Sequence, residues 1–118
     1  MRMSDQEYFR SCVARERHLA HLLGHNVEEF YEDAGTLWDG TTAMPKWTRD
    51  WAVCAPLIVQ HEIPIRFDRE PGAVHAHCVH AGPVSVHLAD YPDRQHAVMY
   101  AVVKAVISLL EHRRHRHH

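Results

Sequence analysis

The sequence predicts a single α+β domain in which about three helices pack with a three-stranded antiparallel sheet. Apolar residues recur at helical spacing in an N-terminal, a central and a C-terminal segment, and they alternate with polar residues in three short segments before the last helix. The chain of 118 residues has the length of one domain, and its 46% apolar content can form a core without disulfides. We expect the order helix, loop, helix, strand, strand, strand, helix.

The N-terminal helix is expected from residue 5 to about residue 23. Ser4 and Glu7 form a capping box, in which each side chain hydrogen-bonds to the backbone N–H of the other residue. Gly24 is expected to end the helix, because glycine readily adopts the left-handed conformation. One apolar stripe should face the core: Phe9, Cys12, Val13, Leu19, Ala20 and Leu23.

Residues 27–46 are predicted to form an irregular loop. Gly35, Gly40 and Pro45 mark turns, and one short helical turn is expected near residues 28–31. The segment is rich in Glu and Asp, which we interpret as a solvated surface.

A second helix is predicted to follow this loop and to run to about residue 61. Either Thr48 or Asp50 can cap it, since both side chains accept hydrogen bonds from the first turn. Pro56 lies inside the helix, where we expect it to cause a kink.

Three strands and a last helix complete the predicted domain. Apolar and polar residues alternate at residues 63–67, 73–79 and 83–88. The last helix, from about Pro92 to Glu111, is apolar nearly all round, so we expect it at the centre of the core. The sheet should pack its apolar face against this helix and the second one.

The alternation of the strands places their polar side chains on one outer face. The three apolar sets must point the same way, because a shift by one residue would turn one set into water. This face is a candidate binding surface, and we expect it to be polar and half exposed. If a helix covers it, the fold becomes a three-layer sandwich instead. Its predicted members are Arg66, His75, His77, Ser85 and His87.

The pairing of the strands can also be predicted from the turns between them. Pairing Cys78 with Val86 leaves a three-residue loop at 81–83 and puts His77 opposite His87. The same reasoning places Ile65 opposite Ala76 and Arg66 opposite His75.

This histidine-rich hairpin has a second interpretation, a zinc site formed by His75, His77 and His87. Three imidazoles can hold zinc, and neighbouring strands bring side chains close enough to share an ion. Against this, Arg66 would repel a cation, Cys78 is expected on the apolar face, and no Asp or Glu is placed to orient the imidazoles. No cofactor is therefore expected, with zinc as the alternative.

Charge and composition exclude several classes of protein. Residues 112–118, HRRHRHH, are interpreted as a basic, tag-like or disordered tail outside the domain of residues 1–111. Without them, ten Lys and Arg residues face 15 Asp and Glu residues, a net charge near −5 that argues against nucleic-acid binding. No apolar run has the length of a membrane span, and no secretory signal is recognised.

The sequence contains none of the common catalytic motifs. A glycine-rich phosphate loop, a GxSxG motif and an HExxH motif are all absent from it. Cys12, Cys54 and Cys78 all fall on predicted apolar faces, so we interpret them as core thiols in a reducing compartment. Whether the protein is an enzyme is left open, with a non-enzymatic role favoured.

The segment from Leu19 to Glu111 resembles the NinX-like and related "ABA sandwich" proteins, which are small phage and prophage proteins of unknown function. The resemblance is clearest in residues 47–58, WTRDWAVCAPLI, with Trp47, Asp50 and Pro56 as its motif residues. It implies a compact α/β domain of phage origin and carries no catalytic residues. The histidine-rich hairpin departs from the family pattern, which more often has a tryptophan there.

From this resemblance we expect an accessory protein in the cytoplasm of a host bacterium, which acts by binding a host or phage protein. The alternative is a zinc-binding protein that uses the hairpin of residues 75–87. The sequence leaves open whether the chain forms a homodimer.

Overall fold

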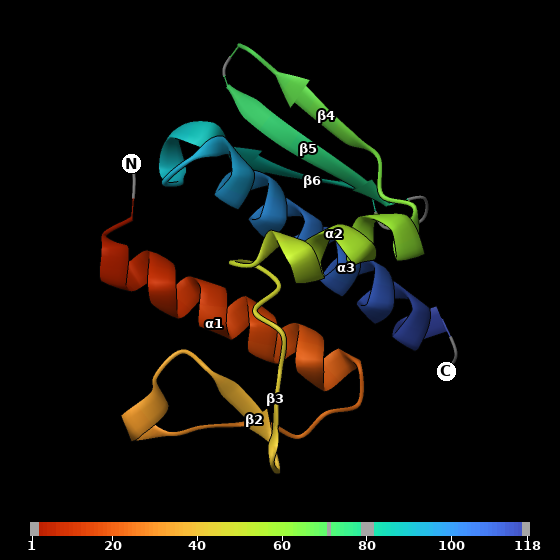
Figure 1. The fold of residues 1–118 in the computed structure, drawn as a ribbon. Helices are drawn as coiled ribbons and strands as arrows, with labels where there is room; N and C mark the ends of the chain where they lie inside the picture. The colour runs from red at the N-terminus through yellow and green to blue at the C-terminus, as the bar shows by residue number, and fades with distance from the viewer. Residues whose placement is uncertain (1–2, 71, 79–81, 117–118) are drawn as a thin grey trace.

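The computed structural model describes residues 3–70, 72–78 and 82–116, and it has the predicted α+β class. Helix α3 (Arg94–Arg116) lies at the centre, between the sheet of β4, β5 and β6 and helix α1, and helix α2 also packs against it (Figure 1). This confirms the central position expected from its apolar surface. Its buried residues are Ala97–Val103, Ala105–Ile107 and Leu109.

Helix α1 (Asp5–Leu22) begins and ends as its sequence predicts. The Ser4 hydroxyl accepts from the N–H of Glu7 at 3.2 Å, and the Glu7 carboxylate accepts from the N–H of Ser4 at 3.3 Å. Gly24 adopts a φ of 93° just beyond the end of the helix, and its N–H donates to the carbonyl of His21. The apolar stripe is buried from Cys12 to Ala20 and also includes one charged residue, Glu16.

The segment between α1 and α2 is more ordered than predicted. It forms a small antiparallel sheet of β1 (Glu28–Glu29), β2 (Leu37–Asp39) and β3 (Thr42–Ala43). The expected helical turn is a 3₁₀ helix, η1 (Tyr31–Asp33), and lies further along the chain. The prediction of an irregular loop was wrong, because strands of two or three residues are too short to show alternation.

Helix α2 (Trp51–His61) confirms the predicted cap and extent. The Asp50 carboxylate accepts from the N–H of Ala52 at 3.1 Å, and the helix continues through Pro56. It ends at Glu62, which adopts the left-handed conformation with a φ of 52°.

Strands β4 (Ile65–Asp68), β5 (Ala73–Cys78) and β6 (Gly82–His87) form the predicted antiparallel meander. Its apolar face includes Val74, Ala76 and Val86, which are buried in the same core as helix α3. No helix of the described chain covers the opposite face (Figure 1), so the three-layer alternative is wrong.

The structure confirms the predicted register between β4 and β5 but not the one between β5 and β6. Ile65 pairs with Ala76 and Arg66 with His75, as expected. In the second pairing, however, His77 lies opposite Pro83 rather than His87. The shift is by an even number of residues, so every side chain keeps its predicted face.

Pro83 is compatible with this second register. The N–H of His77 donates to the carbonyl of Pro64, so the backbone groups of His77 point toward β4 and away from β6. The residue opposite His77 therefore needs no N–H for the ladder, and Pro83 fits there without the loss of a hydrogen bond. The prediction had placed Pro83 in the turn, because pairing Cys78 with Val86 left residues 81–83 as a three-residue loop.

Helix α3 extends beyond the expected domain boundary. It continues past Glu111 to Arg116, within the segment that the sequence assigned to a tail. In the described ranges, no helix combines the length and apolar character that a membrane crossing needs.

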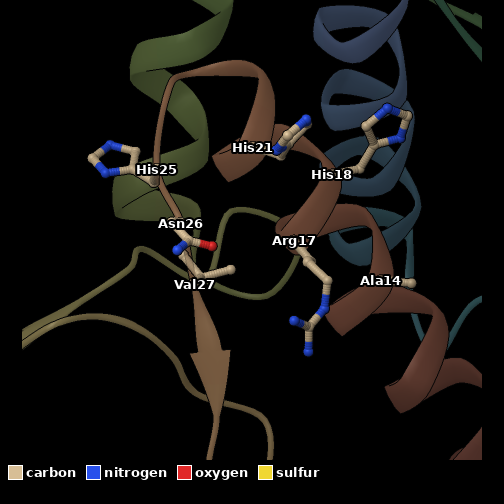
Figure 2. A pocket seen from close by; sticks show the side chains of 7 residues that line it. All are labelled: Ala14, Arg17, His18, His21, His25, Asn26 and Val27. Atoms are coloured by element: carbon tan, nitrogen blue, oxygen red, sulfur yellow. The ribbon is translucent and has the colours of Figure 1, made fainter.

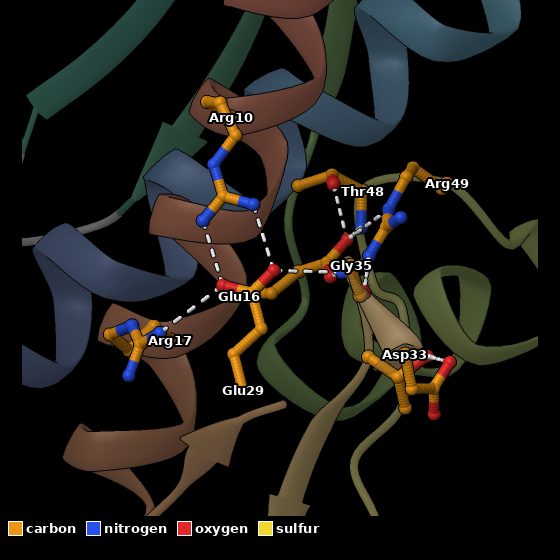
Figure 3. Close-up of polar contacts among 9 residues, drawn as sticks. Arg10, Glu16, Arg17, Glu29, Asp33, Gly35, Thr48 and Arg49 are labelled. Atoms are coloured by element: carbon orange, nitrogen blue, oxygen red, sulfur yellow. Dashed lines mark hydrogen bonds and ion pairs between the residues drawn. The ribbon is translucent and has the colours of Figure 1, made fainter. Parts of the chain in front are cut away.

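A buried ion pair joins α1 to the start of α2 (Figure 3). The Glu16 side chain is 1% exposed and accepts from the Thr48 hydroxyl at 2.5 Å. The Arg49 guanidinium donates to both Glu16 oxygens, at 3.0 and 2.6 Å, and to the carbonyl of Gly35 at 2.7 Å. The buried carboxylate thus has a partner for its charge and hydrogen bonds to both oxygens.

We expect Arg49→Met to lower the free energy of unfolding by about 3–5 kcal/mol, because it leaves the Glu16 charge buried without a partner. Chemical denaturation measures this loss. Lys46→Met removes an exposed positive charge nearby and should change stability by less than about 0.5 kcal/mol. The double variant Glu16→Met/Arg49→Met should be more stable than Arg49→Met alone. If Arg49→Met and Glu16→Met/Arg49→Met lose the same free energy of unfolding, this account is contradicted.

Candidate functional site

The predicted polar face of the meander is present and lies on the uncovered side of the sheet. Arg66, His75 and Ser85 are direct neighbours across three strands, because Arg66 pairs with His75 and His75 with Ser85. His77 and His87 lie on the same face, on β5 and β6 respectively. Ser85 and His87 are exposed, whereas the His75 side chain is only 16% exposed.

His75 is held by two hydrogen bonds from neighbouring strands. Its Nε2 lies 2.7 Å from Oδ2 of Asp68 on β4, and its Nδ1 lies 2.5 Å from Oγ of Ser85 on β6. The other Asp68 oxygen accepts from Arg66 at 2.7 Å. Asp68, His75 and Ser85, here called the Asp–His–Ser relay, therefore form one continuous chain of polar contacts.

Sequence reasoning missed Asp68 because it placed this residue in the turn after β4. The signal was present, since Pro64, Arg66 and Asp68 continue the alternation of the strand's polar side. Asp68 is also the carboxylate whose apparent absence had counted against a zinc site on this face.

The three histidines of the alternative zinc site do not converge. His77 lies opposite Pro83, so His87 is four residues farther along β6, about 13 Å away at the rise of a strand. Within the described part of the chain, no three His, Cys, Asp or Glu side chains are grouped to hold a metal ion. The predicted triad depended on the register that the structure corrects.

A second histidine-rich region lies at the end of α1 (Figure 2). Arg17, His18 and His21 on the helix, together with His25 and Asn26 beyond it, line an open hollow of about 360 Å³. Nδ1 of His25 lies 2.8 Å from Asp39, and Nε2 of His18 lies 3.4 Å from Glu111. Both histidines are partly exposed at the surface and each has a carboxylate neighbour.

The small sheet carries a third candidate, the acidic aromatic surface of Phe30, Tyr31, Glu32, Asp33 and Trp38. The Tyr31 side chain is 99% exposed and Phe30 is 43% exposed. Phe30, Glu32, Asp33 and Trp38 line a hollow of about 370 Å³. The Asp33 carboxylate accepts from the Trp38 indole at 3.1 Å, which fixes a ring and a negative charge side by side.

Glu29 anchors this surface to α1 (Figure 3). Its carboxylate accepts two hydrogen bonds of 2.7 Å from Arg10 and one of 2.8 Å from the N–H of Gly35. The hydrogen bonds from Arg10, with that of Gly35, lower the Glu29 pKa from 4.5 to about 2. Gly35 must lack a side chain, since a Cβ would lie 2.6 Å from the Phe9 ring.

The motif residues of the phage-protein resemblance serve the fold. Trp47 is buried in the core, Asp50 caps α2, and Pro56 lies inside that helix.

The cysteine thiols have raised pKa values. Burial raises the pKa of Cys12, and it raises the pKa of Cys54 to about 12. Both remain protonated at neutral pH and are poor nucleophiles. The side chain of Cys78 lies outside the described part.

We expect the stability contributed by Glu29 to depend on pH. Its pKa is lowered in the folded protein, so the contribution is complete above about pH 4.5 and is lost as the pH falls toward 2. Glu29→Gln should therefore lower the free energy of unfolding at neutral pH and have a smaller effect at acid pH. Urea denaturation across this range measures the difference. The exposed Glu70→Gln is the control, and a Glu29→Gln effect that is constant with pH would refute the assignment.

The chain matches no protein-family model, no curated protein and no solved structure. The resemblance to the NinX-like phage proteins is not tested by these comparisons and stays a prediction.

Proposed function

We propose that the protein binds a basic segment of a partner protein on its acidic aromatic surface. The observation that carries this proposal is the fully exposed ring of Tyr31 beside the carboxylates of Glu32 and Asp33. Among the described residues, neither carboxylate has an ion-pair partner.

The exposed rings support a contact with another protein. Tyrosine, tryptophan and phenylalanine supply large contact areas at low entropic cost and are enriched at the centres of interfaces. Phe30 and Trp38 line the hollow. Tyr31 directly follows Phe30 in the chain, at the start of η1. The anchoring of this segment by Glu29 and Arg49 lets it bind without first becoming ordered.

The charge of the surface supports a partner with lysine or arginine side chains. A cation attracts both a carboxylate and the face of an aromatic ring, and this surface offers the two together. The formal net charge of the chain is −2 at pH 7, and a net negative charge favours the approach of a positive partner.

The resemblance to small phage proteins supports a host or phage protein as this partner, encountered in the cytoplasm of an infected bacterium. In this proposal the protein is an accessory factor whose effect depends on the partner that it occupies.

We expect a short fluorescent peptide of alternating lysine, arginine and glycine residues to bind the protein, and a peptide with glutamate in place of the basic residues to remain unbound. Fluorescence anisotropy measures both. Tyr31→Ala and the double variant Glu32→Gln/Asp33→Asn should each weaken binding by about tenfold, which corresponds to a loss of about 1.4 kcal/mol of binding free energy. In the double variant, the affinity for the basic peptide should also depend less on salt concentration.

Glu62→Gln/Glu70→Gln is the matched control, because it removes two exposed carboxylates elsewhere. If this control weakens binding as much as the Glu32/Asp33 variant does, the peptide responds to net charge alone and the proposed surface is wrong.

A further inference from the structure

We propose that the Asp–His–Ser relay makes Ser85 a nucleophile that accepts an acyl group from small, activated carboxylic esters. This activity lies on the outer face of the meander and is independent of the proposed binding surface on the small sheet.

The hydrogen bonds of His75 fix the direction of proton transfer. An ionised carboxylate can only accept, so the hydrogen bond to Asp68 places the imidazole proton on Nε2. Nδ1 of the neutral ring then carries a lone pair and accepts from the Ser85 hydroxyl at 2.5 Å. This is the arrangement in which a histidine acts as general base for a serine and a carboxylate stabilises the resulting imidazolium.

The three side chains are positioned by rigid elements. Asp68, His75 and Ser85 come from three adjacent strands of one sheet, and Arg66 holds the second oxygen of Asp68 at 2.7 Å. His75 is largely buried between its neighbours, whereas Ser85 is exposed to an incoming substrate.

The backbone of Ser85 supplies a donor for the developing oxyanion. The N–H of Leu88 donates to the carbonyl of Gly72, and backbone groups of successive residues on a strand point to opposite sides. The N–H of Ser85 therefore points away from β5, toward the outer side of the edge strand β6. In serine hydrolases the nucleophile's own N–H is one of the oxyanion donors.

The reaction follows from this geometry. Oγ of Ser85 attacks the ester carbonyl carbon, the carbonyl electron pair moves to oxygen, and the Oγ proton passes to Nδ1 of His75. As the C–O bond to the leaving group breaks, Nδ1 returns the proton to that alkoxide and an alcohol departs. Water then attacks the acyl-Ser85 ester by the same steps, which release the carboxylic acid and restore the serine. The relay stands on an open sheet face, so small acyl groups with good leaving groups fit best.

A fluorophosphonate probe tests the proposal directly. Ser85 Oγ forms a bond to phosphorus, the P–F bond breaks, and the hydroxyl proton passes to His75. We expect mass spectrometry of the digested protein to locate the adduct on Ser85. His75→Ala should slow labelling on the order of a hundredfold, the usual contribution of a general base, and Asp68→Asn should also slow it.

His87→Ala is the matched control, since it removes another histidine of the same face and leaves the relay intact. The fluorophosphonate should label Ser85 of this variant at the same rate as in the unsubstituted protein. Circular dichroism verifies the fold of each variant, and Asp68→Asn, which keeps the side-chain shape, decides the outcome if His75→Ala unfolds. Absence of an adduct on Ser85, or equal labelling rates in folded relay variants and the control, would overturn the proposal.

Discussion

The carboxylate of Glu16 is the point at which three separate parts of the chain meet. It lies on the buried stripe of α1, it binds Thr48 and Arg49 just before α2, and through Arg49 it reaches Gly35 between β1 and β2. A charge inside a core is tolerated only with a well-placed partner, so this residue requires the chain around it to adopt one arrangement. The apolar contacts of α1 alone would specify that arrangement less sharply.

Two surfaces of different character result from this construction. The anchored segment presents aromatic rings beside carboxylates, whereas the outer face of the meander presents hydrogen-bonded histidine, serine and aspartate side chains. Helix α3 lies between them and packs against both α1 and the strands β5 and β6. The two surfaces are therefore fixed to one core, although they share no residues.

Local signals in the sequence predicted much of this fold. The Ser4–Glu7 capping box and Asp50 predicted the start of two helices, and alternation predicted three strands and the face of each side chain, because these features act over a few residues. The buried role of Glu16 had no such signal, since its partner lies 33 residues away. The outer face was predicted residue by residue, but its chemistry depended on Asp68 and on the pairing of His75 with Ser85, which the sequence did not predict.

Pro83 also affects how the sheet can meet other chains. An edge strand exposes a row of N–H and C=O groups, and a second strand that aligned with β6 would form a continuous sheet. The backbone groups of Pro83 face this open side, where proline has no N–H to donate. A strand from another molecule would thus find an interrupted ladder, so Pro83 disfavours aggregation through this edge.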